Sequence, residues 1–305
     1  MIEKTKGVDR AANIVLATGM IFILFPLVIT LVTATQSYED FVRNGFSFMP
    51  GTHFLDNISI VIETTHLPRQ ILNSIIMATM MATIKCVIAF LTAYAIVYFR
   101  IRYGGIIFAM VLVTNLMPLE LRFITTYQVA SNVMLPVNAF LEFTGIARII
   151  ELISGHHPHY KLSILNTYFG LAAPLLANGT GTFLFRQYFR SLPADLSKAA
   201  KMDGAGPIRF LWDILMPLSK SNFAALFLIM FLGGWTQYLW PLVAASTPEM
   251  QTAVVGLARL SPGIPGEVPQ YPAIMAGAVM VSVIPLLMIA FMQRHIVRGL
   301  TLTEK

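Results

Sequence analysis

Long apolar stretches separated by short polar connections dominate this chain. A helix that crosses a bilayer needs about 20 mostly apolar residues. Stretches of roughly that length cover residues 12–34, 71–97, 105–125, 163–186, 221–245 and 271–292. The first run is too long for the apolar core of a signal peptide, so we expect it to be a retained helix. The pattern predicts an all-α polytopic membrane protein with six transmembrane helices.

The polar connections would alternate between the two sides of the membrane. The outer connections are residues 35–70, 126–162 and 246–270, and the longest inner one is residues 187–220. Within the second outer connection, residues 127–153 mix apolar and polar positions in a way that predicts an amphipathic helix on the outer surface.

Composition supports the membrane class and excludes several others. Hydrophobic residues make up 56% of the chain and charged residues 12%, against about 25% charged in soluble proteins. The net charge is +6, but the basic residues are scattered rather than gathered in the tract expected of a nucleic-acid-binding protein. A single cysteine, Cys86, leaves no disulfide framework within the chain, and its apolar surroundings favour a packing role.

The distribution of basic residues predicts the orientation. With both termini in the cytoplasm, 14 of the 21 Lys and Arg fall on the inner side, 6 fall on the outer side, and Lys85 lies within a span. An excess of Lys and Arg in cytoplasmic loops is typical of membrane proteins. We therefore expect both termini to be cytoplasmic.

The inner connection 187–220 carries strong local signals. Pro193 suits the first turn of a helix, and Asp203-Gly204 supplies a turn with a residue free to adopt positive φ. A second helix can begin near Pro207. The sequence predicts a helix, a tight turn and a helix projecting from the membrane. The alternative is an amphipathic hairpin lying on the lipid surface; a DNA-binding helix-turn-helix is disfavoured, because a hairpin tethered between two spans has little freedom to enter a major groove.

The residues of this hairpin resemble the cytoplasmic signature loop of binding-protein-dependent ABC importer permeases. The matching positions are Ala199, Ala200, Asp203, Gly204, Ala205, Ile214 and Pro217. Lys198 stands where that loop usually has Glu, and Met216 where it usually has Leu. The resemblance covers most of the chain, including "LNSIIMAT" at 72–79, "FLFRQYFRSLPADL" at 183–196, "GGWTQYLWPL" at 233–242 and "MQRHIVRGLTLTEK" at 292–305. The chain is similar to the maltose-type carbohydrate permeases, and within them to permease subunits of sn-glycerol-3-phosphate importers.

This resemblance implies a type I ABC importer permease fold, with one permease domain over residues 1–305 in a bacterial inner membrane. The coupling hairpin, residues 187–220, would lodge in a cleft of a cytoplasmic ATPase, with Phe210 and Leu211 as candidate anchors. The implied partners are a second permease subunit in a heterodimer, two copies of the ATPase, an extracytoplasmic substrate-binding protein and membrane lipid. The solute would be sn-glycerol-3-phosphate, moved by alternating access, with a neutral sugar or oligosaccharide as the alternative.

The motifs that the chain lacks restrict its chemistry. No Gly-x-x-x-x-Gly-Lys-Ser/Thr sequence occurs, so we expect ATP and Mg to bind to the partner ATPase and this chain to bind no cofactor. No Asp falls within the predicted spans, which argues against an intramembrane aspartyl protease. A proton-coupled secondary transporter stays a less favoured alternative, since it usually has several ionisable groups within the membrane. No catalytic residue is predicted.

Four polar residues are candidates for the substrate pathway: Asn115, Glu120, Arg122 and Gln237. Glu120 and Arg122 lie near the outer half of the third predicted span, where an ionisable group is costly unless it is paired or faces water. Arg122 could hold a phosphate by a bidentate contact. The alternative is that the span ends at Pro118 and both charges are in water.

For the other polar and aromatic residues, the sequence allows both a functional and a structural role. Lys85 is either functional or paired with a neighbouring helix. His156, His157 and His159 look like a metal cluster but are more typical of a solvated loop, so no metal site is predicted. Asn178, Thr180 and Thr182, with Gly179 and Gly181, favour helix packing over ligand binding, and Gly233 and Gly234 favour close packing. Tyr238 and Trp240 are predicted to join an interfacial aromatic belt that could also include Trp235.

Overall fold

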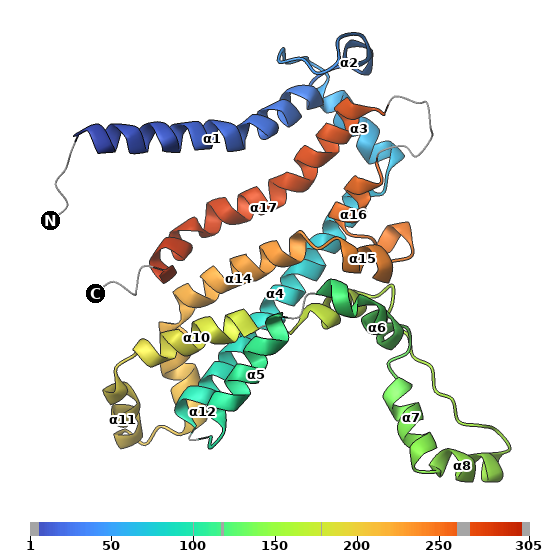
Figure 1. The fold of residues 1–305 in the computed structure, drawn as a ribbon, viewed down its shortest axis with the longest axis vertical. Coiled ribbons are helices and arrows are strands. Elements are labelled where there is room, and N and C mark those ends of the chain that lie inside the picture. Colours follow the sequence, from blue (N-terminus) through green and yellow to red (C-terminus); the bar gives the residue numbers. More distant parts are fainter. Residues whose placement is uncertain (1–5, 100, 117–118, 178, 261–268, 301–305) are drawn as a thin grey trace. The chain divides into compact units, whose positions relative to one another are not determined.

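The structure, a computed structural model, describes residues 6–99, 101–116, 119–177, 179–260 and 269–300, and regular structure in these ranges is helical throughout (Figure 1). The first half of the chain contains α1 (Lys6–Ala34), α2 (Tyr38–Asn44), α3 (Phe54–Thr64), α4 (Leu67–Tyr98), α5 (Gly104–Leu116), α6 (Leu119–Ser131), α7 (Leu135–Phe143) and α8 (Ile146–Ser154). The second half contains α9 (Tyr168–Ala172), α10 (Gly179–Ser191), α11 (Ala194–Met202), α12 (Pro207–Arg209), α13 (Met216–Leu218), α14 (Lys220–Trp235), α15 (Leu239–Ala244), α16 (Ala253–Ala258) and α17 (Tyr271–Leu300).

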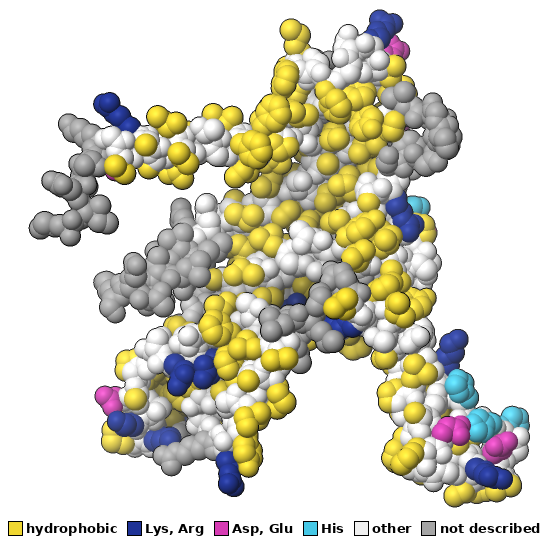
Figure 2. All heavy atoms as spheres, in the orientation of Figure 1, with side chains coloured by type: hydrophobic (Ala, Val, Ile, Leu, Met, Phe, Trp, Pro, Cys, Tyr) yellow, Lys and Arg dark blue, Asp and Glu magenta, His cyan; other side chains and the backbone are white. Residues whose placement is uncertain are grey.

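Among the described residues, three helices are long and apolar enough to cross a membrane unaided: α1, α4 and α17. They confirm the helices predicted over residues 12–34, 71–97 and 271–292. A fourth candidate is bent by 74° between Pro207–Leu218 and Lys220–Trp235. Apolar side chains stay exposed along α1, where Phe22 is 80% exposed, and Figure 2 shows a hydrophobic surface over this helix. Such a surface suits lipid rather than water.

The structure divides the other three predicted spans into shorter helices. The stretch 105–125 becomes α5 and α6, the stretch 163–186 contains α9 and α10, and the stretch 221–245 becomes α14 and α15. Proline accounts for one of the breaks. Pro174 follows α9 directly and has no N–H with which to continue its hydrogen-bond ladder. The carbonyl that Pro174 leaves free, that of Gly170, instead accepts a 3.1 Å hydrogen bond from the indole Nε1–H of Trp240.

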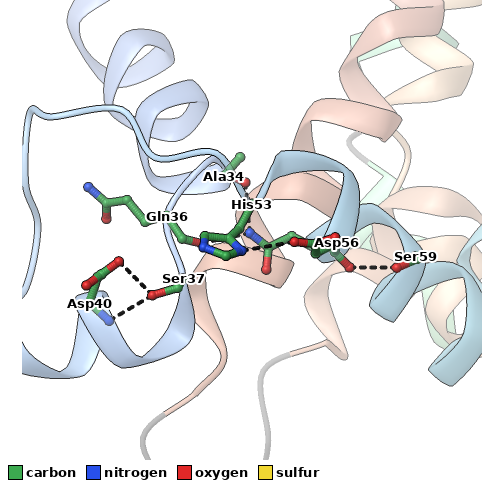
Figure 3. A network of polar contacts seen from close by, with 8 residues as sticks. Ala34, Gln36, Ser37, Asp40, His53, Asp56 and Ser59 are labelled. Carbon is green, nitrogen blue, oxygen red and sulfur yellow. Dashed lines mark hydrogen bonds and ion pairs between the residues drawn. The ribbon is translucent and has the colours of Figure 1, made fainter.

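The chain forms two compact units, the first of which comprises Met1–Arg69 and Gly256–Ile284. Its polar centre lies between the end of α1 and the start of α3 (Figure 3). The buried amide of Asn57 donates to the carbonyls of Ala34 and Gln36, each at 2.9 Å. Ser37 caps α2 by accepting a 3.0 Å hydrogen bond from the backbone N–H of Asp40. These bonds satisfy the backbone where α1 ends and turns into α2.

The second unit comprises Gln70–Val255 and Pro285–Lys305. Its aromatic core joins α4, α10 and α14: the ring of Phe90 lies 5.3 Å from those of Phe185 and Phe189 and 4.8 Å from that of Phe223. Gly234 permits a close approach of α14 to α4, since a Cβ at this position would lie 2.6 Å from Cε of Met81. The predicted packing role therefore fits Gly234. Gly233 has nothing within 4 Å of such a Cβ.

A buried cluster around Trp240 closes the opposite end of this unit from the coupling hairpin. Trp240 is 1% exposed and packs with Met77 and Met81 of α4 and Leu171 of α9. The prediction that Trp240 belongs to an interfacial belt is therefore wrong, because its indole bonds to Gly170 inside the protein. Trp235 is also buried, at 3% exposed. Tyr238, at 38% exposed, can still serve in a belt.

Candidate functional site

The turn of the coupling hairpin is built by the end of α11. Asp203 is the C-cap and Gly204 adopts a left-handed φ of 73°. The N–H of Ala205 donates to the carbonyl of Ala200 at 2.9 Å, and that of Gly204 donates to the carbonyl of Lys201 at 3.1 Å. These two bonds define a Schellman motif, which ends a helix and reverses the chain. The sequence pair Asp203-Gly204 thus produces the turn that was predicted for it.

The alanines of the hairpin have different environments. Ala200 is buried, at 4% exposed, whereas Ala199 is exposed on the surface. Ala205 and Ile214 are partly buried, and Pro217 is exposed. Of the two alanines, only Ala199 is therefore accessible on the surface of α11.

The second arm begins at Pro207, as predicted, and is fastened to the end of α4. The phenol of Tyr94 donates a 2.9 Å hydrogen bond to the carbonyl of Pro207, and the ring of Tyr98 lies 5.1 Å from that of Phe210. Residues Phe210–Leu215 form a π-helical segment, a wider coil that often marks functional sites. Neither tyrosine was predicted from the sequence. Their signal was the spacing of two aromatic residues, i and i+4, on one face of α4.

The large apolar residues of the second arm fall into a buried set and an exposed set. Phe210 and Leu211, predicted as anchors, are 6% and 8% exposed. Their burial shows that they anchor the hairpin to the body of this chain. The exposed members are Ile208, at 74%, Trp212, at 59%, and Leu218, at 48%, and Met202 of α11 is 82% exposed. Met202, Ile208 and Trp212, which were not predicted from the sequence, are the most exposed of these side chains.

Two ion pairs lie on the surface of the hairpin. Lys198, which replaces the usual Glu of the signature loop, is 2.9 Å from Asp195 Oδ1. Arg209 Nε is 3.3 Å from Asp213 Oδ2. All four side chains are mostly exposed, so each pair contributes little to stability. The hairpin is therefore held by its backbone turn and its buried rings.

The other arm of the hairpin continues from α10, which packs against α5. The phenol of Tyr188 donates a 2.7 Å hydrogen bond to the carbonyl of Leu218, just before α14 begins. Gly179, Gly181 and Thr182 are buried on α10, which supports the packing role predicted for this stretch. Asn178 lies outside the described residues.

The predicted pathway residues have different surroundings in the structure. Arg122 lies on α6, is partly buried, and has a buried Nε that forms no hydrogen bond among the described residues. Gln237 instead donates to the carbonyl of Gly233 at 3.2 Å, so its amide is used within its own chain segment. Asn115 and Glu120 fall in α5 and α6, but their side chains lie outside the described part. Arg122 is the pathway candidate with an unused donor.

Lys85 is a second basic side chain in an apolar setting. It is partly buried in the middle of α4, next to the buried Cys86. No described carboxylate forms an ion pair with it. A charged amine at this depth needs a counter-charge or water.

One histidine of the outer connection, His157, bridges two carboxylates. His157 Nε2 is 2.6 Å from Glu142 Oε1 of α7, and its Nδ1 is 3.0 Å from Glu151 Oε2 of α8. The hydrogen bonds to Glu151 and then Glu142 raise the pKa of His157 above its ordinary value. Because the two carboxylates bind different ring nitrogens, this is a hydrogen-bonded staple. Within the described residues, no group of three His, Cys, Asp or Glu could hold a metal ion.

Known proteins resemble the chain in both sequence and fold. It is 37% identical over 311 residues to the sn-glycerol-3-phosphate transport system permease protein UgpE of Yersinia pestis bv. Antiqua (strain Antiqua). It is 35% identical over 312 residues to the protein of the same name from Brucella melitensis biotype 1, and each alignment covers 100% of both chains. A chain of a bacterial ABC transporter involved in import of the acidic polysaccharide alginate has the same fold, with a TM-score of 0.71, 19% identity, and coverage of 96% of this chain and 98% of the other.

The family comparison agrees with these likenesses. Residues 85–302, which include the coupling hairpin, Arg122 and the described part of α17, match the model of the binding-protein-dependent transport system inner membrane component. Its members are components of transport systems rather than enzymes. The chain belongs to the family of binding-protein-dependent transport system inner membrane components.

Proposed function

We propose that this chain is a permease subunit of an ATP-driven importer for sn-glycerol-3-phosphate. The observation that carries this proposal is identity of 35% to 37%, over the whole length, to permeases named for that transport system. The unused guanidinium donor of Arg122 is compatible with a phosphate ester, which Arg binds by two parallel hydrogen bonds.

The proposed assembly has four kinds of component. This chain, a single permease domain over residues 1–305, pairs with a second permease in the inner membrane. Two ATPase subunits bind ATP and Mg at the cytoplasmic face, and a substrate-binding protein delivers the solute outside. The proposed topology has six crossings with both termini cytoplasmic. The excess of Lys and Arg in the loops then assigned to the inside supports this orientation.

The coupling hairpin links the ATPase to the membrane helices in this mechanism. Met202, Ile208 and Trp212 dock in an apolar cleft of the ATPase, since they are the large apolar side chains that the hairpin exposes most. When ATP closes the ATPase pair, the hairpin moves as one piece, because the turn at Gly204 is fixed by two backbone hydrogen bonds. The bond from Tyr94 to Pro207 passes that movement to α4. Packed elements of this kind transmit small shifts by rigid-body motion.

In this mechanism the anionic solute passes two basic side chains, Arg122 and Lys85, that form no ion pair among the described residues. A phosphate ester released by the binding protein replaces water at Arg122 and gains a charge-assisted contact. Lys85 offers a second positive charge on a helix connected to the hairpin. Both charges favour an anionic solute over a neutral sugar.

Uptake of labelled sn-glycerol-3-phosphate by cells that lack the chain, with and without complementation, tests the substrate. We expect uptake that requires the chain and resists competition by maltose or a neutral monosaccharide. Arg122→Gln is expected to raise KM at least tenfold, and Arg122→Lys is expected to raise it less, because Lys keeps the charge but loses the bidentate geometry. Chain-dependent uptake of labelled sugar in place of the phosphate ester would overturn the substrate while keeping the family.

A further inference from the structure

The hairpin formed by α7 and α8 in the outer connection is an ordered element. Gly145, with a left-handed φ of 72°, joins the two helices, and Ala147 is buried between them at 1% exposed. The side chain of Asn138 fixes the returning chain, since it donates to the carbonyl of Tyr160 at 2.8 Å and accepts from the N–H of Tyr160 at 3.0 Å. Within its own unit, Figure 1 shows this hairpin extending away from α5 and α10. We call it the outer hairpin.

The outer hairpin has one strongly apolar side. At 100° per residue, Ile146, Ile149, Leu152 and Ile153 share a face of α8. Leu152 and Ile153 are each 81% exposed, and Phe143 at the end of α7 is 91% exposed. Figure 2 shows hydrophobic side chains gathered on one side of this element, while the charged and His side chains gather on the other. A patch of this kind in water would be costly.

The polar side of the outer hairpin satisfies its own charges. A neutral imidazole carries only one N–H, whereas His157 faces a carboxylate with each ring nitrogen. Protonation of His157 allows both ring nitrogens to donate, and its positive charge then offsets part of the negative charge of Glu142 and Glu151. The staple keeps both carboxylates on the polar side and leaves the apolar side free of acidic groups.

We propose that the apolar side of the outer hairpin lies on the outer surface of the phospholipid bilayer. The face is amphipathic, short and attached to a membrane domain, which is the arrangement of a helix that rests in the headgroup region. Exposed Arg148 lies at the edge of the apolar face, beside Leu152, where its side chain can reach a lipid phosphate. Its positive charge complements the negatively charged headgroups.

The same observations disfavour a soluble partner as the occupant. A binding protein that delivers solute must leave in every transport cycle, and its departure would return the exposed side chains to water. The face also contains only aliphatic and Phe side chains, without the Trp, Tyr and central Arg that carry most binding energy at protein interfaces. A bilayer covers the face continuously.

Nitroxide labels on the full chain, assembled with its partner subunits in phospholipid nanodiscs, test this proposal. Cys86→Ala supplies a background without cysteine, and the label positions are Leu152→Cys and Ile153→Cys on the apolar face. Ser154→Cys on the polar face is the matched control. Should Cys86→Ala fail to assemble, the same labels serve in the natural background, because Cys86 is 2% exposed. The measured quantities are collision rates with oxygen, which concentrates in lipid, and with a water-soluble nickel chelate.

We expect collisions with oxygen to exceed those with nickel several-fold at positions 152 and 153, and the ratio to reverse at 154. This pattern must be present without the binding protein. Nickel access at all three positions would overturn the proposal. If neither reagent reached positions 152 and 153, these residues would contact the second permease, and the proposal would be wrong. It would also be wrong if protection from nickel appeared only when the binding protein was added.

Discussion

The phenol of Tyr94 donates a 2.9 Å hydrogen bond to the carbonyl of Pro207 and so joins α4 to the second arm of the coupling hairpin. Pro207 is the first residue of α12, and Tyr94 lies one turn before the end of α4. The ring contact between Tyr98 and Phe210 lies one helical turn further along α4. A displacement of the hairpin therefore acts on a helix that is long enough to cross the membrane.

Tyr94→Phe keeps the ring and removes the hydrogen bond to Pro207. A net contribution of about 1 kcal/mol is typical of such a bond. We expect the variant to assemble normally and to hydrolyse ATP with a lower yield of transported solute. The ratio of solute imported to ATP hydrolysed, measured in proteoliposomes, checks this expectation. Tyr103→Phe is the control, because Tyr103 is 57% exposed on the surface. Equal ratios in both variants would contradict the proposed link.

Gly204→Ala and Gly204→Val should impair transport in that order. There is open space around a Cβ at this position, so the cost comes from the left-handed φ of 73°. That cost is about 1–2 kcal/mol for a residue with a Cβ, and it is higher for a β-branched side chain. Gly206→Ala is the matched control, because Gly206 has a φ of −71° and equally open surroundings. Uptake rates of the three variants at equal membrane levels distinguish the turn from the mere presence of glycine.

Trp212→Ser and Ile208→Ser should weaken binding of the ATPase subunits. Both side chains project from the hairpin, so their removal leaves the core of the permease intact. Loss of one well-packed apolar anchor typically costs 1–3 kcal/mol of binding free energy, roughly a 5- to 150-fold change in Kd. Co-purification and the dissociation rate of the ATPase report the effect. Leu55→Ser, at an equally exposed apolar position in α3, should leave the ATPase bound; an identical loss there would refute a specific docking role.

Long, uninterrupted apolar runs made α1, α4 and α17 predictable from sequence. The other runs were predicted as single helices because hydropathy does not resolve local breaks, such as the one that follows α9 at Pro174. The helix, turn and helix of the coupling hairpin were also predictable, since Asp203-Gly204 and Pro207 act locally.

Side-chain direction was the part that sequence could not provide. Trp240 looked like a belt residue, but it is buried and its indole donates to the carbonyl of Gly170, 70 positions earlier in the chain. Phe210 and Leu211 looked like outward anchors, but they face Tyr98 and the core. Both outcomes depend on tertiary packing that local patterns do not encode.

The His157 staple should respond to pH. Hydrogen bonds to Glu151 and Glu142 raise the pKa of His157 above its ordinary value of about 6.5. A raised pKa means that the staple stabilises the outer hairpin fully below pH about 6.5 and loses this contribution as pH rises through the raised value. Hydrogen exchange of residues 140–157 should therefore quicken with increasing pH beyond the intrinsic rate change. His157→Gln should abolish that excess and His156→Gln should retain it; an unchanged excess in His157→Gln would assign it elsewhere.

Solute uptake by proteoliposomes that contain the complete transporter tests most directly whether ATP drives transport through this hairpin. ATP is supplied on the side of the membrane that carries the ATPase. We expect labelled sn-glycerol-3-phosphate to accumulate against its gradient only with the binding protein, ATP and this chain all present. Gly204→Val should abolish accumulation, and Gly206→Ala should preserve it. Accumulation without ATP, or at an unchanged rate in Gly204→Val, would contradict an ATP-driven permease that is coupled through this hairpin.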